Sequence, residues 1–227
     1  MAQERDTDTT EPAAAVPAPV ESAPVESAPA EVEAVEVEVA EPEEAPPLDP
    51  EVEARRAAAM TFIRRLGDPV LKSRATPVDR FDESLRRQVS RMAGIMNDAL
   101  GVGLAAPQLG ISQRLLVYRV GPDAPLTVLA NPELEWVSGE LELGEEGCLS
   151  IPGVTVDVDR PLHVRVRALD EEGEERMVEA SGLEARVIQH EMDHLDGVLI
   201  LERTTRDERK RALRELREAE QRRDEAA

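Results

Sequence analysis

The feature that most constrains the fold of this chain is a strict alternation of apolar and polar residues between positions 153 and 170. An alternation with a period of two places every second side chain on the same face of an extended backbone. The segment Asp159-Arg160-Pro161 interrupts the run, so the pattern predicts two β-strands that pair with each other and share one buried face. The residues expected on that face are Val154, Val156, Val158, Leu162, Val164 and Val166.

Residues 181–197, SGLEARVIQHEMDHLDG, follow the period of an α-helix instead. Ser181 and Glu184 have the spacing of a capping box, and Gly197 stands where such a helix would end. An amphipathic helix is predicted over residues 81–101, and a highly charged surface helix over residues 206–223. The apolar positions of these two helices are Leu85, Val89, Met92, Met96 and Leu100 in the first, and Leu213 and Leu216 in the second.

Shorter segments predict further strands over residues 114–120, after a turn at Gly173, and over residues 198–202. Strands therefore dominate around one helix, with helices at both ends of the folded part. The sequence predicts an α+β fold, with antiparallel or mixed sheets packed around a central helix that carries HEMDH at 190–194. An N-terminal helix and a charged C-terminal helix complete this expected architecture.

The first part of the chain differs sharply in composition. Residues 1–53 hold 16 acidic residues against Arg5 alone, and the remaining 32 acidic and 26 basic residues follow, within a total charge of −21. A segment built mainly from Ala, Pro, Val and Glu cannot bury enough apolar surface to offset the entropy of ordering. We therefore expect residues 1–58 to be a disordered acidic extension and residues 59–227 to form a single catalytic domain. The extension is interpreted as solubilising, with docking to a basic partner as the alternative.

The composition also limits the compartment and the partners. Cys148 is the only cysteine, so no intrachain disulfide can form and a reducing compartment is expected. No apolar run approaches the roughly 18 residues of a membrane helix, and the N-terminus lacks the features of a secretory signal. The acidic balance disfavours nucleic-acid binding. The sequence thus predicts a cytoplasmic protein without membrane contact or sequence-specific nucleic-acid binding.

Two of the three histidines, His190 and His194, lie four residues apart on the predicted helix 181–197. They differ by about 40° around the helix axis and about 6 Å along it, so both imidazoles can reach one metal ion. Glu191 lies about 100° from His190, where it can hold a water as a general base but is poorly placed as a ligand. This H-E-x-x-H pattern favours a metal site over a histidine pair that is simply satisfied in the core.

A third ligand is required, and the segment after His194 offers neither another histidine nor a clear apolar helix with a glutamate. Upstream, Cys148 lies in GEEGCLSIPG between predicted strands. It could instead be a small buried apolar residue, or a nucleophile with a histidine base. A Cys/His/His donor set with an open position for water is a known arrangement, and this favours Cys148 as the ligand.

Residues 101–110, GVGLAAPQLG, form a small-residue segment between a predicted helix and a predicted strand. Gly101 and Gly103 permit the close approach of another backbone. Gln108 can donate a hydrogen bond from its side-chain amide. An ordinary glycine-rich connection is the alternative, and a phosphate loop is disfavoured because no G-K-[ST] follows.

Taken in order, GVGLAAPQ (101–108), EGCLS (146–150) and QHEMDH (189–194) resemble the motifs of the peptide deformylase family. The resemblance runs from about Phe62 to the C-terminal helix and includes RRLGDPVL (64–71). Each motif alone is moderately specific, whereas the three in this order and spacing are very specific.

This resemblance implies one divalent metal ion bound by Cys148, His190 and His194, with a water in the fourth position. The usual ion of the family is ferrous iron, and such a donor set also accepts zinc, nickel or cobalt. Glu191 would take a proton from the attacking water and pass it to the leaving amine.

The remaining roles are implied by the same resemblance. Gln108 and the backbone N–H of Leu149 would stabilise the oxyanion at the formyl carbon. The residues implied in substrate binding are Val102, Gly103, Gly147, Leu183 and Val187, together with the ring of His190.

The reaction implied is the removal of the N-formyl group from the N-terminal formyl-methionine of newly synthesised proteins, with release of formate. The partners would be nascent formyl-methionine polypeptides and, transiently, the ribosome. A zinc endopeptidase is one alternative, but such enzymes lack the EGCLS and GVGLAAPQ motifs. A non-catalytic binding relative is another, but it would be expected to lose a ligand or the base, all of which are present here.

Several neighbouring residues remain to be placed by the structure. The resemblance pairs Glu146 with Arg160 as an ion pair that supports the cysteine loop. Gly144 is small where relatives often carry an aliphatic residue, and the stem of Arg186 could line the pocket wall with its charge outside. Asp193 could orient a ligand histidine or face solvent. The residues interpreted as structural are His163, Trp136 and Tyr118.

Overall fold

The computed structural model describes residues 48–121 and 123–226, which all belong to one compact unit. Residues 1–47, the larger part of the segment predicted to be disordered, lie outside the described residues. The helices of the described part are α1 (Pro50–Met60), α2 (Glu83–Asp98), α3 (Gly182–Leu195) and α4 (Arg206–Ala226). Its short 3₁₀ helices are η1 (Pro69–Lys72), η2 (Ala106–Leu109) and η3 (Ile200–Glu202).

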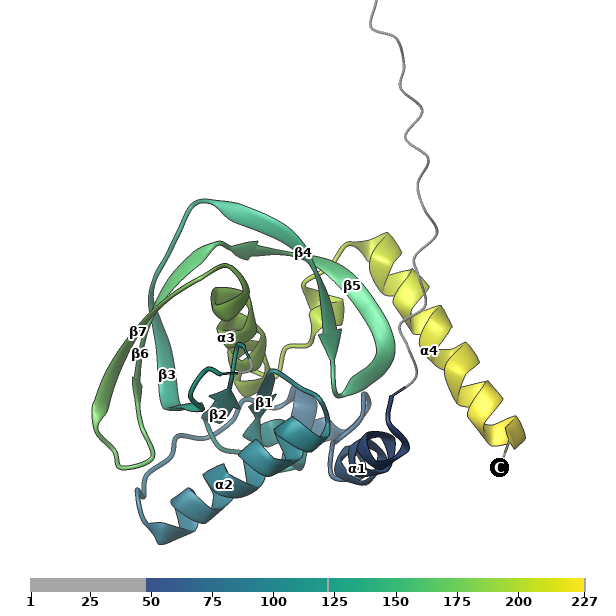
Figure 1. The fold of residues 1–227 in the computed structure, drawn as a ribbon. Helices are drawn as coiled ribbons and strands as arrows, with labels where there is room; N and C mark the ends of the chain where they lie inside the picture. The colour runs from purple at the N-terminus through teal and green to yellow at the C-terminus, as the bar shows by residue number, and fades with distance from the viewer. Residues whose placement is uncertain (1–47, 122, 227) are drawn as a thin grey trace, which may run out of the picture. The chain divides into compact units, whose positions relative to one another are not determined.

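The strands of the described residues form two antiparallel sheets. The five-stranded sheet has the order β1-β2-β3-β6-β7, with β1 (Gly103–Ala105), β2 (Leu115–Tyr118), β3 (Thr127–Val137), β6 (His163–Leu169) and β7 (Glu175–Ser181). The two-stranded ribbon consists of β4 (Leu141–Cys148) and β5 (Ile151–Pro161). Helix α3 lies between the five-stranded sheet and the ribbon (Figure 1). The expected α+β class with antiparallel sheets is therefore confirmed.

The alternating segment forms two strands, but the prediction that they pair with each other was wrong. Strand β5 pairs with β4, whereas β6 pairs with β3 and β7. Only Leu162 separates β5 from β6, which is too short for a hairpin turn, so the chain passes directly from one sheet into the other. The expected apolar face is nonetheless buried at Val154, Val156, Val158, Val164 and Val166, and only Leu162 at the crossing is half-buried.

Two local predictions around α3 were also wrong. The predicted capping box does not form, because the Ser181 hydroxyl contacts Nδ1 of His163 at 2.8 Å and Glu184 accepts a hydrogen bond from the Tyr118 hydroxyl at 2.9 Å. The segment 198–202 forms no strand, and its last three residues form η3 instead. Its short apolar run does not distinguish a strand from a helical turn, and it buries Ile200 against the β4–β5 ribbon without joining either sheet of the described residues.

Helix α1 occupies residues that were predicted to be disordered. Asp49 caps it by accepting a hydrogen bond from the N–H of Glu51 at 2.8 Å, and Pro50 stands in its first turn. Ala59 is buried and α1 packs against α2. Residues 50–58 are therefore helical. The start signal Asp49-Pro50-Glu51 is readable in the sequence, but it lies at the end of the acidic, proline-rich segment.

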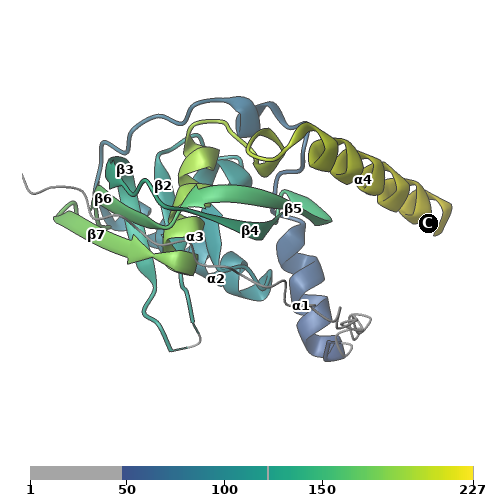
Figure 2. The same cartoon turned by 90° about the horizontal axis from the view of Figure 1, so that it is seen from above.

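The core surrounds α3 on two sides. Residues such as Ile188 and Leu195 pack with Leu116 and Leu129 of the five-stranded sheet. The β4–β5 ribbon packs its own apolar face against η3 and α4, and Figure 2 shows α4 beside one end of the ribbon and extending beyond it. Each fully buried leucine or isoleucine contributes about 1.5–3 kcal/mol, so α3 is held rigidly between the two sheets.

Among the described helices, none is both long and apolar enough to cross a membrane.

Candidate metal centre

Helix α3 carries His190, Glu191 and His194 on the side that faces the β4–β5 ribbon and β1. Glu191 and His194 are buried, and His190 is largely buried. The two imidazole rings lie edge to face, with centroids 5.1 Å apart. The spacing of four residues therefore does bring both histidines to one point.

Cys148 reaches the same point from the end of β4. The register of the ribbon shifts between Gly147 and Cys148, and such an irregularity re-aims the side chain that follows it. The Cys148 sulfur lies 3.4 Å from Nε2 of His194, and the ligand atoms of Cys148, His190 and His194 all lie within 4.8 Å of one another. One sulfur and two imidazole nitrogens at this spacing can hold a divalent metal ion and leave a fourth position open.

The protonation states of these groups also fit a metal site. Burial raises the pKa of the Cys148 thiol, but the charge of His194 and the hydrogen bonds of both histidines outweigh it and hold the pKa well below its ordinary value. The thiolate is the form that binds metal ions. Nδ1 of His190 donates to the carboxylate of Glu146 at 3.0 Å, which leaves Nε2 of His190 as the donor for an ion.

Glu191 presents a free carboxylate oxygen to this centre. Its Oε2 atom is buried and has no hydrogen-bond partner among the described residues. Burial raises the pKa of the Glu191 carboxyl above its ordinary value. A buried acceptor without a partner is costly unless water or a ligand supplies one, so Glu191 is placed to exchange a proton with a molecule in front of the metal ligands.

Glu146 is buried behind His190 and forms ion pairs or hydrogen bonds with three surrounding side chains. It accepts two hydrogen bonds from Arg160, at 2.8 and 2.9 Å, and one from Arg186 at 2.9 Å. Burial alone would raise the pKa of Glu146, but Arg160 and His190 outweigh it and hold the pKa at about 2. The predicted pair of Glu146 and Arg160 is therefore confirmed, and it is fully buried.

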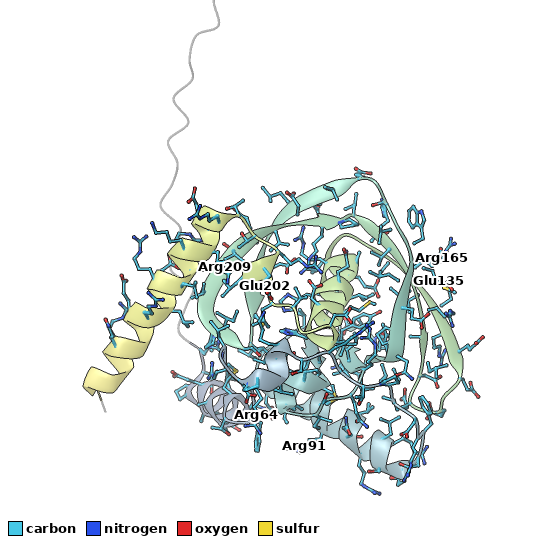
Figure 3. The ribbon with its side chains drawn as sticks, turned by 180° about the vertical axis from the view of Figure 1, so that it is seen from behind. Arg64, Arg91, Glu135, Arg165, Glu202 and Arg209 are labelled. Carbon is cyan, nitrogen blue, oxygen red and sulfur yellow. The ribbon has the colours of Figure 1, made fainter. Side chains whose placement is uncertain are left out.

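Exposed ion pairs elsewhere differ from this network. Arg167 of β6 contacts Glu135 of β3 at 3.0 Å on the exposed face of the five-stranded sheet, and Figure 3 shows Glu135 on the outer side of the molecule. Exposed pairs of this kind contribute about 0–1 kcal/mol. The buried network is thus the one whose disruption would matter for stability.

Asp193 matches neither of its two predicted roles. It is buried, and it accepts a hydrogen bond from Arg160 at 2.7 Å and one from Arg203 at 3.0 Å. It therefore does not face solvent, and within the described residues it contacts no ligand histidine. It is connected to His190 indirectly, by hydrogen bonds that run through Arg160 and Glu146.

Arg186 also departs from expectation, because its charge lies inside the protein. The guanidinium donates to Glu146 and to the backbone carbonyl of Val158 at 2.8 Å. Gly144 provides the room for it, since a Cβ at that position would lie 2.8 Å from Cζ of Arg186. The small residue at 144 and the arginine at 186 are therefore complementary.

Gln108 approaches the centre from the opposite wall, on η2. Its Oε1 atom accepts a hydrogen bond from the backbone N–H of Ala105 at 2.8 Å. Because a backbone N–H can only donate, this contact fixes the amide orientation and turns Nε2 toward the sulfur of Cys148 at 3.8 Å. The buried amide nitrogen of Gln108 is thus a donor beside the metal ligands.

A cavity of about 370 Å³ opens in front of these groups. Its inner wall is formed by Gln108, Cys148, His190 and Glu191, while the buried His194 lies behind them. The other residues implied in oxyanion or substrate binding all line the cavity as well: Val102, Gly103, Gly147, Leu149, Leu183 and Val187. Val102 and Leu183 are 47% and 58% exposed, so they stand at its rim.

Several further residues that line this cavity were not assigned to it from the sequence, among them Leu100, Arg56 and Met60. Leu100 was predicted to be the last apolar position of a helix, but it follows α2 with a φ of 59° and is 52% exposed at the cavity. Arg56 and Met60 come from α1. The capping signal at Asp49-Pro50 could have revealed that helix, whereas nothing local indicates that it reaches the cavity.

Comparison with known proteins identifies the relatives of this chain. A sequence profile of polypeptide deformylase matches residues 60–210. A peptide deformylase of Parafrankia sp. is 48% identical over 158 residues, which cover 70% of this chain and 86% of the relative. One from Thermotoga neapolitana is 51% identical over 144 residues, or 63% of this chain and 87% of the relative.

Solved structures agree with the sequence relatives. A crystal structure of a peptide deformylase from Synechococcus elongatus in complex with actinonin has a TM-score of 0.65 and 47% identity, and the match covers 67% of this chain and 85% of that one. A peptide deformylase from Legionella pneumophila has a TM-score of 0.67 and 41% identity, over 70% of this chain and 94% of the other.

Proposed function

This chain belongs to the polypeptide deformylase family, and we propose that its cavity is where it removes the formyl group from the N-terminal formyl-methionine of newly synthesised proteins. One observation carries the proposal for these residues. A thiol, two imidazoles and an unpartnered carboxylate converge from β4 and α3 on one cavity that opens to the surface. The products are formate and a free α-amino group.

Cys148, His190 and His194 are the residues we assign to a divalent ion, with ferrous iron as the proposed ion and zinc, nickel or cobalt as ions that suit the same donors. A bound divalent ion supplies Lewis acidity, which makes water available as a nucleophile near neutral pH. Glu146 orients His190 through its hydrogen bond to Nδ1.

Glu191 is the residue we assign to proton transfer. Its free Oε2 atom can hold the attacking water and take its proton, and it can then deliver that proton to the nitrogen of the leaving amine. The burial that raises its pKa favours this exchange, because a carboxyl that binds a proton more readily can also carry it between two steps.

Gly103 sets the position of Glu191, and this leads to a testable prediction. A Cβ at Gly103 would lie 2.5 Å from Oε1 and 2.9 Å from Cγ of Glu191. We expect Gly103→Ala to displace the carboxylate and lower kcat/KM for a formyl peptide by about 10²-fold, with the fold retained. Gly94→Ala on α2, where a Cβ would meet nothing within 4 Å, is the matched control. Equal activity of the two variants would show that Gly103 does not fix the base.

Gln108 and Leu149 are assigned to the oxyanion. The Nε2 group of Gln108 already points toward the metal ligands, and Leu149 lines the same cavity directly after Cys148. Donors that are positioned before the reaction stabilise the charge that develops on the formyl oxygen, and one such donor contributes about 3–4 kcal/mol.

The methionine side chain is assigned to the apolar part of the cavity. Val102, Leu183 and Val187 provide an aliphatic wall, next to the stem of Arg186. Gly103 and Gly147 carry no side chains, so the backbone of an extended substrate can approach them closely. Nascent polypeptides in the cytoplasm are the proposed substrates, which implies transient contact with the ribosome.

The direct test is formate release from formyl-Met-Ala-Ser, compared with acetyl-Met-Ala-Ser and with an internal peptide bond of an unmodified peptide. Release of formate from the first substrate alone is the expected result. Cleavage of internal bonds would instead support an endopeptidase. A folded, metal-loaded protein that releases no formate from any formyl peptide would overturn the proposal.

A further inference from the structure

Helix α1 brings a cationic side chain to the cavity from outside the family match. The family profile begins at residue 60, so Arg56 lies before it, and Arg56 lines the cavity together with Met60 of α1 and with Val154 and Thr155 of β5. Figure 1 shows α1 next to the end of the β4–β5 ribbon at which the turn joins the two strands. We infer that Arg56 binds an acidic side chain of the substrate, in the segment that follows the formyl-methionine, and so makes the enzyme select substrates by charge. This inference rests on the proposed deformylase function.

The position of Arg56 is fixed by the packing of α1. Arg56 and Met60 are four residues apart and therefore lie on the same side of the helix, one turn from each other. Met60 packs against the first core cluster, and Ala59 is buried beside it. The cap at Asp49 holds the other end of the helix. The guanidinium thus projects from an anchored helix and not from a free end of the chain.

The charges around the cavity single out Arg56. The other arginine that lines it, Arg186, is saturated by Glu146 and by backbone carbonyls. Within residues 48–121 and 123–226, the guanidinium of Arg56 makes no hydrogen bond or ion pair. Glu145 is the exposed anion of the same cavity and lies on β4. Among the described residues, the rim therefore carries a positive charge without an ion-pair partner on α1 and a negative charge on the ribbon. A charged substrate residue would be attracted at one of these places and repelled at the other.

The substrate is oriented by the centre of the cavity. Its formyl end must lie at Glu191 and Cys148, so the residues after methionine extend outward toward the rim. An exposed ion pair at the rim contributes about 0.2–1 kcal/mol, which corresponds to a preference of up to about fivefold for an acidic over a neutral residue. A lysine at the same position would be disfavoured, and salt would weaken the discrimination.

The test uses formyl-Met peptides of four residues, with glutamate or lysine placed in turn at the second, third and fourth position. For the full-length metal-loaded enzyme, we expect kcat/KM to be about two to ten times higher with glutamate than with lysine at the third or fourth position. The difference should lie mainly in KM, because a contact at the rim is equally strong in the ground state and in the transition state. Arg56→Gln should bring the ratio of the two kcat/KM values close to one. Arg55→Gln, an exposed arginine on the same helix that does not line the cavity, should leave it unchanged.

The outcomes separate this inference from the proposed function. If no peptide releases formate, the deformylase proposal fails first. If formate is released but the glutamate-to-lysine ratio is the same in the wild type and in Arg56→Gln at every position, the role of Arg56 is overturned. Equal losses in Arg55→Gln and Arg56→Gln would also overturn it, because they would reflect the overall charge of α1.

Discussion

Replacement of Glu191 by glutamine is expected to lower kcat for formyl-peptide hydrolysis by about two to four orders of magnitude. Glutamine keeps the size of the side chain but cannot accept and return a proton, and general acid–base transfer typically contributes 10²–10⁴-fold. The metal content should stay at the wild-type level, because the ligand atoms belong to Cys148, His190 and His194. Steady-state kinetics and metal analysis of the same preparation provide the measurement.

A carboxylate elsewhere on α3 serves as the control for this variant. Glu184 accepts a hydrogen bond from Tyr118 and does not line the cavity. Glu184→Gln should therefore keep kcat within about threefold of the wild type. If Glu191→Gln lost its metal together with its activity, the result would contradict a role restricted to proton transfer.

Replacement of Glu146 by glutamine is expected to lower the free energy of unfolding by about 3–5 kcal/mol, because it removes the charge that compensates the buried guanidinium of Arg160. The NH₂ group of the new glutamine would also face the N–H groups of Arg160 and Arg186, which can only donate hydrogen bonds. Urea unfolding at neutral pH measures the effect. Glu145→Gln, next to it on an exposed position of β4, should change the unfolding free energy by less than about 0.5 kcal/mol.

The same carboxylate implies a pH dependence of stability. The pKa of Glu146 is lowered from 4.5 to about 2 by folding, so its stabilising contribution is fully present above pH 4.5 and is lost as the pH falls toward 2. In Glu146→Gln, the part of acid destabilisation that falls in this window should be absent. A variant with wild-type stability at pH 7 and the same acid unfolding curve would contradict the network described for Glu146.

The parts of the site that follow from local geometry could be predicted from the sequence. The spacing of His190 and His194 determines their common side of a helix, and the structure brings them within reach of Cys148. The alternation over 153–170 predicted the buried face correctly, but not the partners of the strands. Pairing depends on residues far along the chain, and here a single residue, Leu162, carries the chain between two sheets.

Other features were hidden by composition or by distance. Strand β3 contains Asn131 with a φ of 52° and irregular pairing with β6, so it has no regular alternation to recognise. The buried position of Arg186 depends on Gly144 and Glu146, which lie about 40 residues earlier in the sequence. Charged residues are ordinarily assigned to the surface, and only tertiary contacts could show that this one is enclosed.

We propose that Cys148 completes a metal site with the histidines of α3 and that this site hydrolyses formyl-methionine. It is tested most directly by measuring bound metal and formate release together, in wild type and Cys148→Ala purified without oxygen. We expect about one divalent ion per chain and formate release in the wild type, and the loss of both in a folded Cys148→Ala. A Cys148→Ala protein that retains its metal and releases formate at the wild-type rate would contradict it.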